Sequence, residues 1–273
     1  MRNRLIFLGM LSCVGIFSAS ALRIVFIEDT ASAPAARSWT DPNAALLLVH
    51  LNMEATNATQ TLDVSGNNYH ANLLPTPGTG PTWHEDYYTN ENARGESLYE
   101  TDGNDDKLDC GLPIAWPLAT NWSMSVWAKW KDESVGYPPI VDCWKYQTSG
   151  FRWRVNFATT DQMILYLGNS ANTLLGNTVI TTQVWHHVAL THAKSGGNAD
   201  VTMYLDGAYE TNKTITAGVN CVTNMVIMGQ NDANNEAKVW IDDYRYYLGV
   251  ALTAADVTNV WHNTAPTNCI EVR

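Results

Sequence analysis

Basic residues are scarce in this chain. Its 273 residues include 16 Lys and Arg against 27 Asp and Glu, which gives a formal net charge of −11. A nucleic-acid partner requires a Lys/Arg surface that neutralises its phosphates, and no basic run occurs here. The composition therefore argues against a nucleic-acid partner. Acidic residues gathered in turns would suit a hard cation such as calcium.

Cysteines are few and widely spaced, and motifs of common hydrolases are missing. No CxxC pair occurs, so a zinc site is not expected, and no Gly-x-Ser-x-Gly motif is present. The even number of cysteines after residue 21 predicts two disulfides if the chain is exported, with three possible pairings. Of these we favour one bond between Cys110 and Cys269 and another between Cys143 and Cys221.

The N-terminus has the pattern of an export signal. Arg2 and Arg4 form a basic start, residues 5–17 are apolar, and residues 19–21 read ASA, a small-x-small cleavage pattern. Residues 5–27 are also nearly continuously apolar, about the ~20 residues that a membrane helix requires. We therefore expect residues 1–21 to be a cleaved signal peptide or a retained membrane anchor, and the rest to be secreted or held at the cell surface.

Two further segments follow the signal. Residues 22–43 begin with a β-prone stretch and continue as an Ala/Ser/Pro-rich stretch that reads as an extended linker. No internal repeat is visible in residues 44–273, so we expect a single domain there.

Helical patterns are nearly absent, and short alternating strands dominate. Residues 184–191 (VWHHVALT) and 201–207 (VTMYLDG) flank a Gly-rich break, which predicts a β-hairpin. Residues 253–257 form the one helix-like piece, with Thr253 as N-cap and Asp256 three residues later. About a dozen strands at this spacing predict an all-β fold, a two-sheet antiparallel sandwich of the jelly-roll type.

Several segments, in order, resemble one family. Residues 185–189 and 204–207 resemble the W-x-H-V-A and L-Y-V-D-G signatures of laminin-G-like domains, which belong to the concanavalin A-like lectin/glucanase superfamily. Four further segments resemble motifs of its bacterial group: 63–70 (DVSGNNYH), 102–106 (DGNDD), 122–130 (WSMSVWAKW) and 241–257, which contains IDDYRYY and LTAADV. The resemblance covers about residues 46–263 and implies a concanavalin A-like jelly roll.

The resemblance also implies a calcium site. The family's calcium ligands come from segments matched here by the turns near residues 63 and 102 and by the strand at residue 242. Calcium prefers six to eight oxygens, mostly carboxylates and carbonyls. The alternative is an acidic turn cluster without an ion, since turns favour Asp and Asn in any case. The expected ligands are Asp63, Asn68, Asp102, Asp106 and Asp242.

A sugar site is expected on one strand face. Residues 151–157 (FRWRVNF) alternate, so that Phe151 and Trp153 face the core while the polar residues face outward. Outward Arg and Asn can hydrogen-bond sugar hydroxyls or carboxylates, although they also suit an ordinary solvated face. With two aromatic residues of the preceding strand, the expected ligand-binding residues are Trp144, Tyr146, Arg152, Arg154 and Asn156.

Catalysis is not expected. A retaining glycosidase needs two carboxylates about 5 Å apart, and the Glu-x-Asp-x-x-Glu strand of laminarinase-type relatives is missing. Asp242 and Asp243 are neighbours in a strand and should point to opposite faces.

The resulting hypothesis is an exported, surface-displayed binding module that recognises carbohydrate or a surface protein and contains a structural calcium. The alternative is a structural subunit of an extracellular filament or sheath. In that case residues 22–43 would assemble subunits by adding a strand to a neighbour's open sheet edge.

Overall fold

The computed structural model describes residues 41–53, 56–57, 59–74, 80–84, 98–111, 120–131, 137–144, 150–167, 169–215, 223–230 and 238–264. The chain divides into two compact units, residues 1–38 and 39–273, and the described residues all belong to the second. The expected signal peptide and almost all of the expected linker lie outside the described residues. Within the described part, no helix has the length and apolar character needed to cross a membrane.

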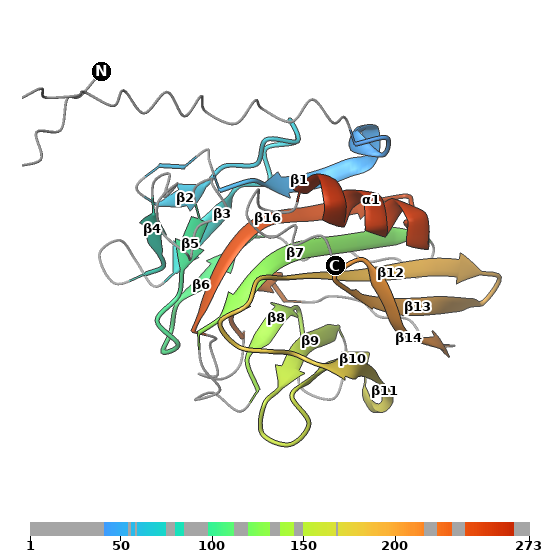
Figure 1. The fold of residues 1–273 in the computed structure, drawn as a ribbon. Helices are drawn as coiled ribbons and strands as arrows, with labels where there is room; N and C mark the ends of the chain where they lie inside the picture. Colours follow the sequence, from blue (N-terminus) through green and yellow to red (C-terminus); the bar gives the residue numbers. More distant parts are fainter. Residues whose placement is uncertain are drawn as a thin grey trace, which may run out of the picture. The chain divides into compact units, whose positions relative to one another are not determined.

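Eight antiparallel strands form the first sheet (Figure 1). β1 pairs with β16 and stands outside the main path of the sheet. A 3-10 helix, Ala44–Leu46, leads into β1. The strands are, in spatial order, β14 (Ala208–Ile215), β13 (Asn198–Leu205), β12 (His186–Ser195), β7 (Trp122–Trp130), β16 (Val239–Leu248), β5 (Leu98–Glu100) and β4 (Thr82–His84), with β1 (Leu47–Leu51).

The second sheet also has eight strands, and its pairings too are antiparallel. In spatial order they are β11 (Asn169–Val179), β10 (Gln162–Leu167), β9 (Phe151–Asn156), β8 (Pro139–Asp142), β15 (Val226–Ile227), β6 (Lys107–Asp109), β3 (Ala71–Leu74) and β2 (Gln60–Thr61).

The two sheets pack face to face over a core built from alternate residues of their strands. In β9 the buried Phe151, Trp153 and Val155 alternate with partly exposed polar residues. In β7 the inward set runs from Trp122 to Trp130 at every second position. This is the period-2 pattern of strands that bury one face. The predicted two-sheet sandwich is confirmed.

The predicted hairpin is β12 and β13, paired in register from Val188 opposite Leu205 to Ser195 opposite Asn198. Gly196 in its turn has φ +61, a left-handed conformation that glycine adopts at little cost. The neighbouring histidines point to opposite faces. His186 contacts Asp206 (2.8 Å), whereas the ring of His187 lies 5.3 Å from that of Trp127.

One helix lies against the outer face of the first sheet (Figure 1). It is α1 (Ala254–Thr264), longer than the predicted turn of helix, and its N-terminus is capped as expected: Asp256 accepts from the Thr253 amide at 2.9 Å. Val257 and Val260 pack on Tyr204 and Tyr247 of the sheet. The described part of the second sheet has no such helical cover.

Candidate functional site

The acidic turn before β6 brings three carboxylates together. Ligand oxygens of Asp102, Asp105 and Asp106 lie within 4.8 Å of one another. The turn is built by its own side chains: the Asp102 amide donates to Asp106 (2.8 Å), and the Asn104 amide donates to Asp102 (2.8 Å). Asp106 is buried, whereas the other two aspartates are exposed. Of the expected calcium ligands, the structure therefore places Asp102 and Asp106 together and adds Asp105, which the sequence analysis missed.

Asp63 lies in a different part of the fold and has an evident local role. Its carboxylate accepts hydrogen bonds from the amides of His50 (2.8 Å), Ser65 (2.9 Å) and Tyr69 (3.0 Å). Burial alone would raise the pKa of Asp63, but these hydrogen bonds outweigh it and lower the pKa. Asp63 thus fastens its loop to β1. Asn68 is exposed, with φ +62, and it is Asn67 whose amide donates to the Leu47 carbonyl (3.0 Å).

Asp242 lies outside the three-carboxylate group of the acidic turn. It is fully buried in β16, next to a β-bulge between Asp242 and Arg245. Ile241 and Tyr244 both face the core, and Asp243 has φ +51. The expectation that Asp242 and Asp243 simply alternate between faces is wrong, because the bulge inserts one residue into the strand.

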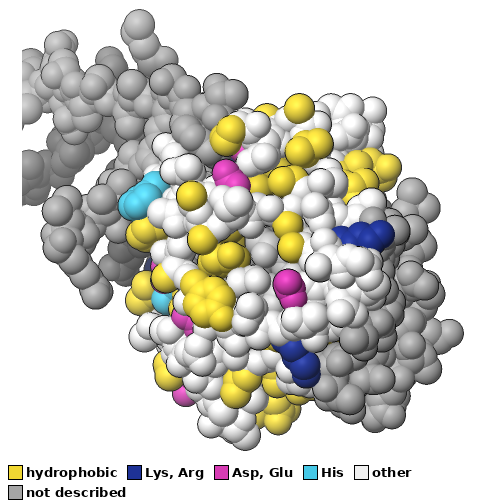
Figure 2. All heavy atoms as spheres, turned by 90° about the vertical axis from the view of Figure 1, so that its right-hand side faces the viewer, with side chains coloured by type: hydrophobic (Ala, Val, Ile, Leu, Met, Phe, Trp, Pro, Cys, Tyr) yellow, Lys and Arg dark blue, Asp and Glu magenta, His cyan; other side chains and the backbone are white. Residues whose placement is uncertain are grey.

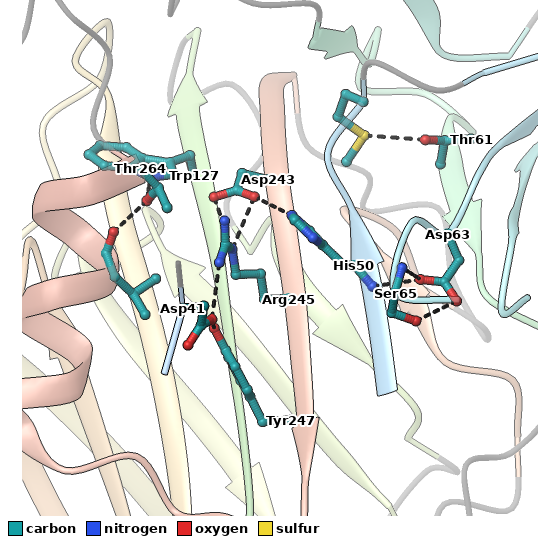
Figure 3. Close-up of polar contacts among 12 residues, drawn as sticks. Asp41, His50, Thr61, Asp63, Ser65, Trp127, Asp243, Arg245, Tyr247 and Thr264 are labelled. Atoms are coloured by element: carbon teal, nitrogen blue, oxygen red, sulfur yellow. Dashed lines mark hydrogen bonds and ion pairs between the residues drawn. The ribbon is translucent and has the colours of Figure 1, made fainter. Parts of the chain in front are cut away.

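The bulge supports a buried polar network on the first sheet (Figure 3). Arg245 contacts Asp243 (3.1 Å) and Asp41 (3.1 Å), and Asp243 also contacts His50 (2.8 Å). Tyr247 donates to Asp41. Burial alone would lower the pKa of Arg245, but Asp243 and Tyr247 together raise it. The network ties Asp41, which precedes the 3-10 helix, to the last strand, β16, and none of it was predicted from the sequence.

The outer face of the second sheet is where the expected sugar-binding residues lie. Arg152, Arg154 and Asn156 project outward from β9, as predicted. Arg152 forms an ion pair with the buried Asp142 of β8 (2.9 Å), whose other oxygen accepts from the Trp144 amide (2.8 Å). The positive charge of Arg152 is therefore balanced by Asp142 on the adjacent strand.

Arg154 lies between two tyrosines. Its guanidinium carbon is 4.4 Å from the ring centre of Tyr137 and 4.7 Å from that of Tyr166, and its Nη2 donates to the Tyr166 hydroxyl at 2.9 Å. Trp144 is almost fully buried and meets Tyr166 edge to face, with ring centres 6.1 Å apart. We refer to Tyr137, Trp144, Arg152, Arg154 and Tyr166 as the aromatic–arginine cluster.

Two expected members of the sugar site do not add to this cluster. Tyr146 lies outside the described residues. Asn156 donates its amide to Thr159 at 2.8 Å, within the turn that follows β9. The members that sequence reasoning missed are Tyr137 and Tyr166. The alternation in β10, which places Tyr166 on the outward face, was the available signal for the second of them.

The cysteines differ from the expected pattern. Cys110 is a buried free thiol, so the predicted bond between Cys110 and Cys269 is wrong. Its side chain faces the core rather than the surface, and burial raises the pKa of its thiol. Cys143 is disulfide-bonded, and its partner lies outside the described residues, as do Cys221 and Cys269. The bond between Cys143 and Cys221 stays a prediction.

The side of the molecule at the right of Figure 1 faces the viewer in Figure 2. Figure 2 shows apolar side chains dispersed among polar ones where that side is described, with few charged groups. Single exposed apolar residues, such as Tyr209 at 57% and Val179 at 55%, are common on protein surfaces and need no ligand.

Comparison with solved structures finds the same fold at low sequence identity. The binding domain of Paraclostridial Mosquitocidal Protein 1 matches with TM-score 0.60 and 14% identity over 80% of this chain and 52% of that one. The ligand binding domain of Botulinum neurotoxin serotype D, in complex with N-acetylneuraminic acid, matches with TM-score 0.56 and 17% identity, over 80% and 51%. The chain spans about half the length of both.

A third structure is matched over nearly its whole length. Domain 4 of AbnA, an extracellular arabinanase from Geobacillus stearothermophilus in complex with arabinotriose, has TM-score 0.56 and 18% identity, over 78% of this chain and 97% of that one. At such identities the likeness shows the fold alone. Among curated proteins, none matches the chain.

The family is assigned by a family model that matches the amino-acid sequence. The Laminin_G_3 model, described as the concanavalin A-like lectin/glucanases superfamily, matches residues 102–258, more than half of the chain. These residues include the acidic turn, β7 to β16 and the aromatic–arginine cluster. The chain belongs to this laminin-G-like family of the concanavalin A-like lectin/glucanases superfamily.

Proposed function

We propose that the chain is an exported, surface-displayed, non-catalytic module that binds carbohydrate on the outer face of its second sheet. The observation that carries this proposal is the aromatic–arginine cluster. Aromatic rings offer apolar faces against which a sugar ring can pack, and guanidinium and hydroxyl groups can hydrogen-bond its hydroxyls. The cluster combines both on β9, on β10 and in the segments that flank β8.

Relatives of the same fold support a carbohydrate ligand. The arabinanase domain is in complex with arabinotriose, and the toxin domain is in complex with N-acetylneuraminic acid. The superfamily description includes both lectins and glucanases, so the fold is compatible with either role. We favour binding, because the sequence lacks the paired-carboxylate strand of the laminarinase type. The oxidised state of Cys143 is in keeping with an exported chain.

The test is a glycan array followed by titration calorimetry on the full chain. Tyr137→Ala should weaken glycan binding about tenfold or more, because it removes the most exposed ring of the cluster. Tyr209→Ala is the matched control, since Tyr209 is an exposed tyrosine on β14 of the other sheet. An absence of glycan binding would contradict the proposal, as would filaments of native material assembled through residues 22–43.

We further propose a structural calcium ion at the acidic turn. Calcium prefers carboxylate oxygens in tight turns, and the spacing of Asp102, Asp105 and Asp106 suits a shared cation. The three charges repel one another without an ion, so calcium should favour the folded state. At a free concentration ~100 times the dissociation constant the gain would be about 2.7 kcal/mol.

Thermal melts with chelator and with added calcium test the calcium site. Chelation should lower the melting temperature, and calcium should restore it better than magnesium, which demands octahedral geometry. Asp105→Asn and Asp106→Asn should reduce the response, whereas Asp200→Asn in the hairpin should not. If chelation leaves the wild-type melt unchanged and elemental analysis finds no calcium, the site does not exist.

A further inference from the structure

The charges on the outer face of the second sheet are unequally compensated. Arg152 lies 2.9 Å from the Asp142 carboxylate, whose side chain is fully buried. Arg154, two residues further along the same face, meets no carboxylate among the residues that the structure describes. In a chain of net charge −11, Arg154 is thus a positive group without a contacting carboxylate in the described part of the structure.

The surroundings of Arg154 orient its guanidinium. Tyr137 and Tyr166 lie at 4.4 and 4.7 Å from the guanidinium carbon, and the bond from Nη2 to the Tyr166 hydroxyl (2.9 Å) sets its rotation. Aromatic rings attract a cation without neutralising it. A planar guanidinium fork held in this way has lost much of its rotamer freedom before a ligand arrives, which lowers the entropy cost of binding.

The hydrogen-bonding groups that remain are donors. The Tyr166 oxygen already accepts from Arg154, so its own hydrogen is directed elsewhere, and the Nη1 group of Arg154 carries two more. A neutral sugar hydroxyl that displaced water here would leave the guanidinium charge uncompensated, which is costly. A carboxylate or sulfate accepts from both donors and balances the charge, through short charge-assisted hydrogen bonds.

We propose that the ligand of the aromatic–arginine cluster is an acidic glycan, whose carboxylate or sulfate is held by Arg154 and the Tyr166 hydroxyl. The adjacent ring of Tyr137 would pack against the apolar side of the sugar. This inference rests on the proposed carbohydrate-binding function and narrows its ligand class.

The experiment uses glycans that share a lactose core and differ in the group at its 3′ position. Lactose, 3′-sialyllactose and 3′-sulfolactose, together with an array of further neutral, carboxylated and sulfated glycans, are titrated against the full chain. We expect acidic forms to bind at least tenfold more tightly than their neutral counterparts, and added salt to reduce this difference. The sialylated and sulfated arms show which acid the site prefers.

Variants then assign the preference to the cluster. Arg154→Gln should abolish the preference for acidic glycans, and Tyr166→Phe should reduce it. Arg154→Lys should retain a part of it, since a lysine keeps the charge but loses the planar fork. Lys194→Gln, at an exposed cation of β12 in the other sheet, should leave it unchanged. Thermal melts of each variant check that the fold is intact.

The outcomes separate this inference from the function on which it rests. Equal binding of neutral and acidic glycans would overturn the inference and leave carbohydrate binding standing. A preference for acidic glycans that survives Arg154→Gln would also overturn it. Binding to no glycan on the array would overturn the proposed function and the inference together.

Discussion

Each sheet carries an arginine on its outer face, and the two arginines have different kinds of partner. On the first sheet Arg245 is buried between two aspartates, and α1 packs against the same sheet. On the second sheet Arg154 is partly exposed between two tyrosines, without a carboxylate among its described neighbours. A charge that is fully compensated contributes to the fold, whereas one that is only oriented remains available for a ligand. The difference points to the second sheet as the binding face.

Replacing each arginine by methionine tests this difference directly. Arg245→Met leaves the buried carboxylates of Asp41 and Asp243 without their cation, and we expect it to lower the free energy of unfolding by about 3–5 kcal/mol. Arg154→Met should cost about 1 kcal/mol or less, because it removes only contacts with two rings and a hydroxyl.

Urea unfolding of both variants at pH 7 measures the difference. Equal losses would show that Arg154 is a structural residue of the second sheet. The assignment of that face to ligand binding would then lose its main support.

The sequence predicted positions on a strand better than partners across strands. Alternation in residues 151–157 placed Arg152 and Arg154 on the outward face, because the pleat alone decides which side a residue takes. The ion pair with Asp142 depends on the register of β8 against β9, and the contact of Arg154 with Tyr166 depends on that of β9 against β10. Neither register is readable from the local pattern.

The bulge in β16 limited prediction on the first sheet. An inserted residue reverses the side taken by every residue beyond it, so simple alternation failed between Asp242 and Arg245. The left-handed φ of Asp243 has no signal that separates it from any other aspartate in a strand. The motif at residues 63–70 was recognised, but its hydrogen bonds to β1 require knowing that β1 lies beside it.

An intermediate loss of stability is expected at Asp63. Its carboxylate accepts hydrogen bonds from backbone amides, whereas that of Asp243 is paired with a cation. Asp63→Asn removes the charge that several amides bond, and we expect a loss of about 1–3 kcal/mol at pH 7. Its folded pKa lies below the ordinary value of about 3.9 in the unfolded chain, so the stabilisation is present above about pH 4 and is lost as the pH falls through the folded pKa.

Urea titrations at pH 7, 4 and 3 test this. The curves of wild type and Asp63→Asn should converge as the pH falls, whereas Asp200→Asn should follow wild type at every pH. A constant gap between wild type and Asp63→Asn across the series would mean that the carboxylate charge does not matter.

The smallest expected effect is the pH dependence of stability that His192 contributes. His192 is buried in the interior between the sheets, where its ring stacks on Trp122 with centres 4.8 Å apart. Burial disfavours the imidazolium and lowers the pKa of His192, against weaker opposing hydrogen bonds. The unfolded chain therefore takes up this proton at a higher pH than the folded protein. This contribution to stability should be fully present above about pH 6.5 and decline below it, by at most ~1.4 kcal/mol per pH unit.

His192→Phe preserves the stacking and removes the titration, so its free energy of unfolding should change less between pH 7 and 5 than that of wild type. Identical slopes for the two proteins would show that the interior tolerates the charge of a protonated His192.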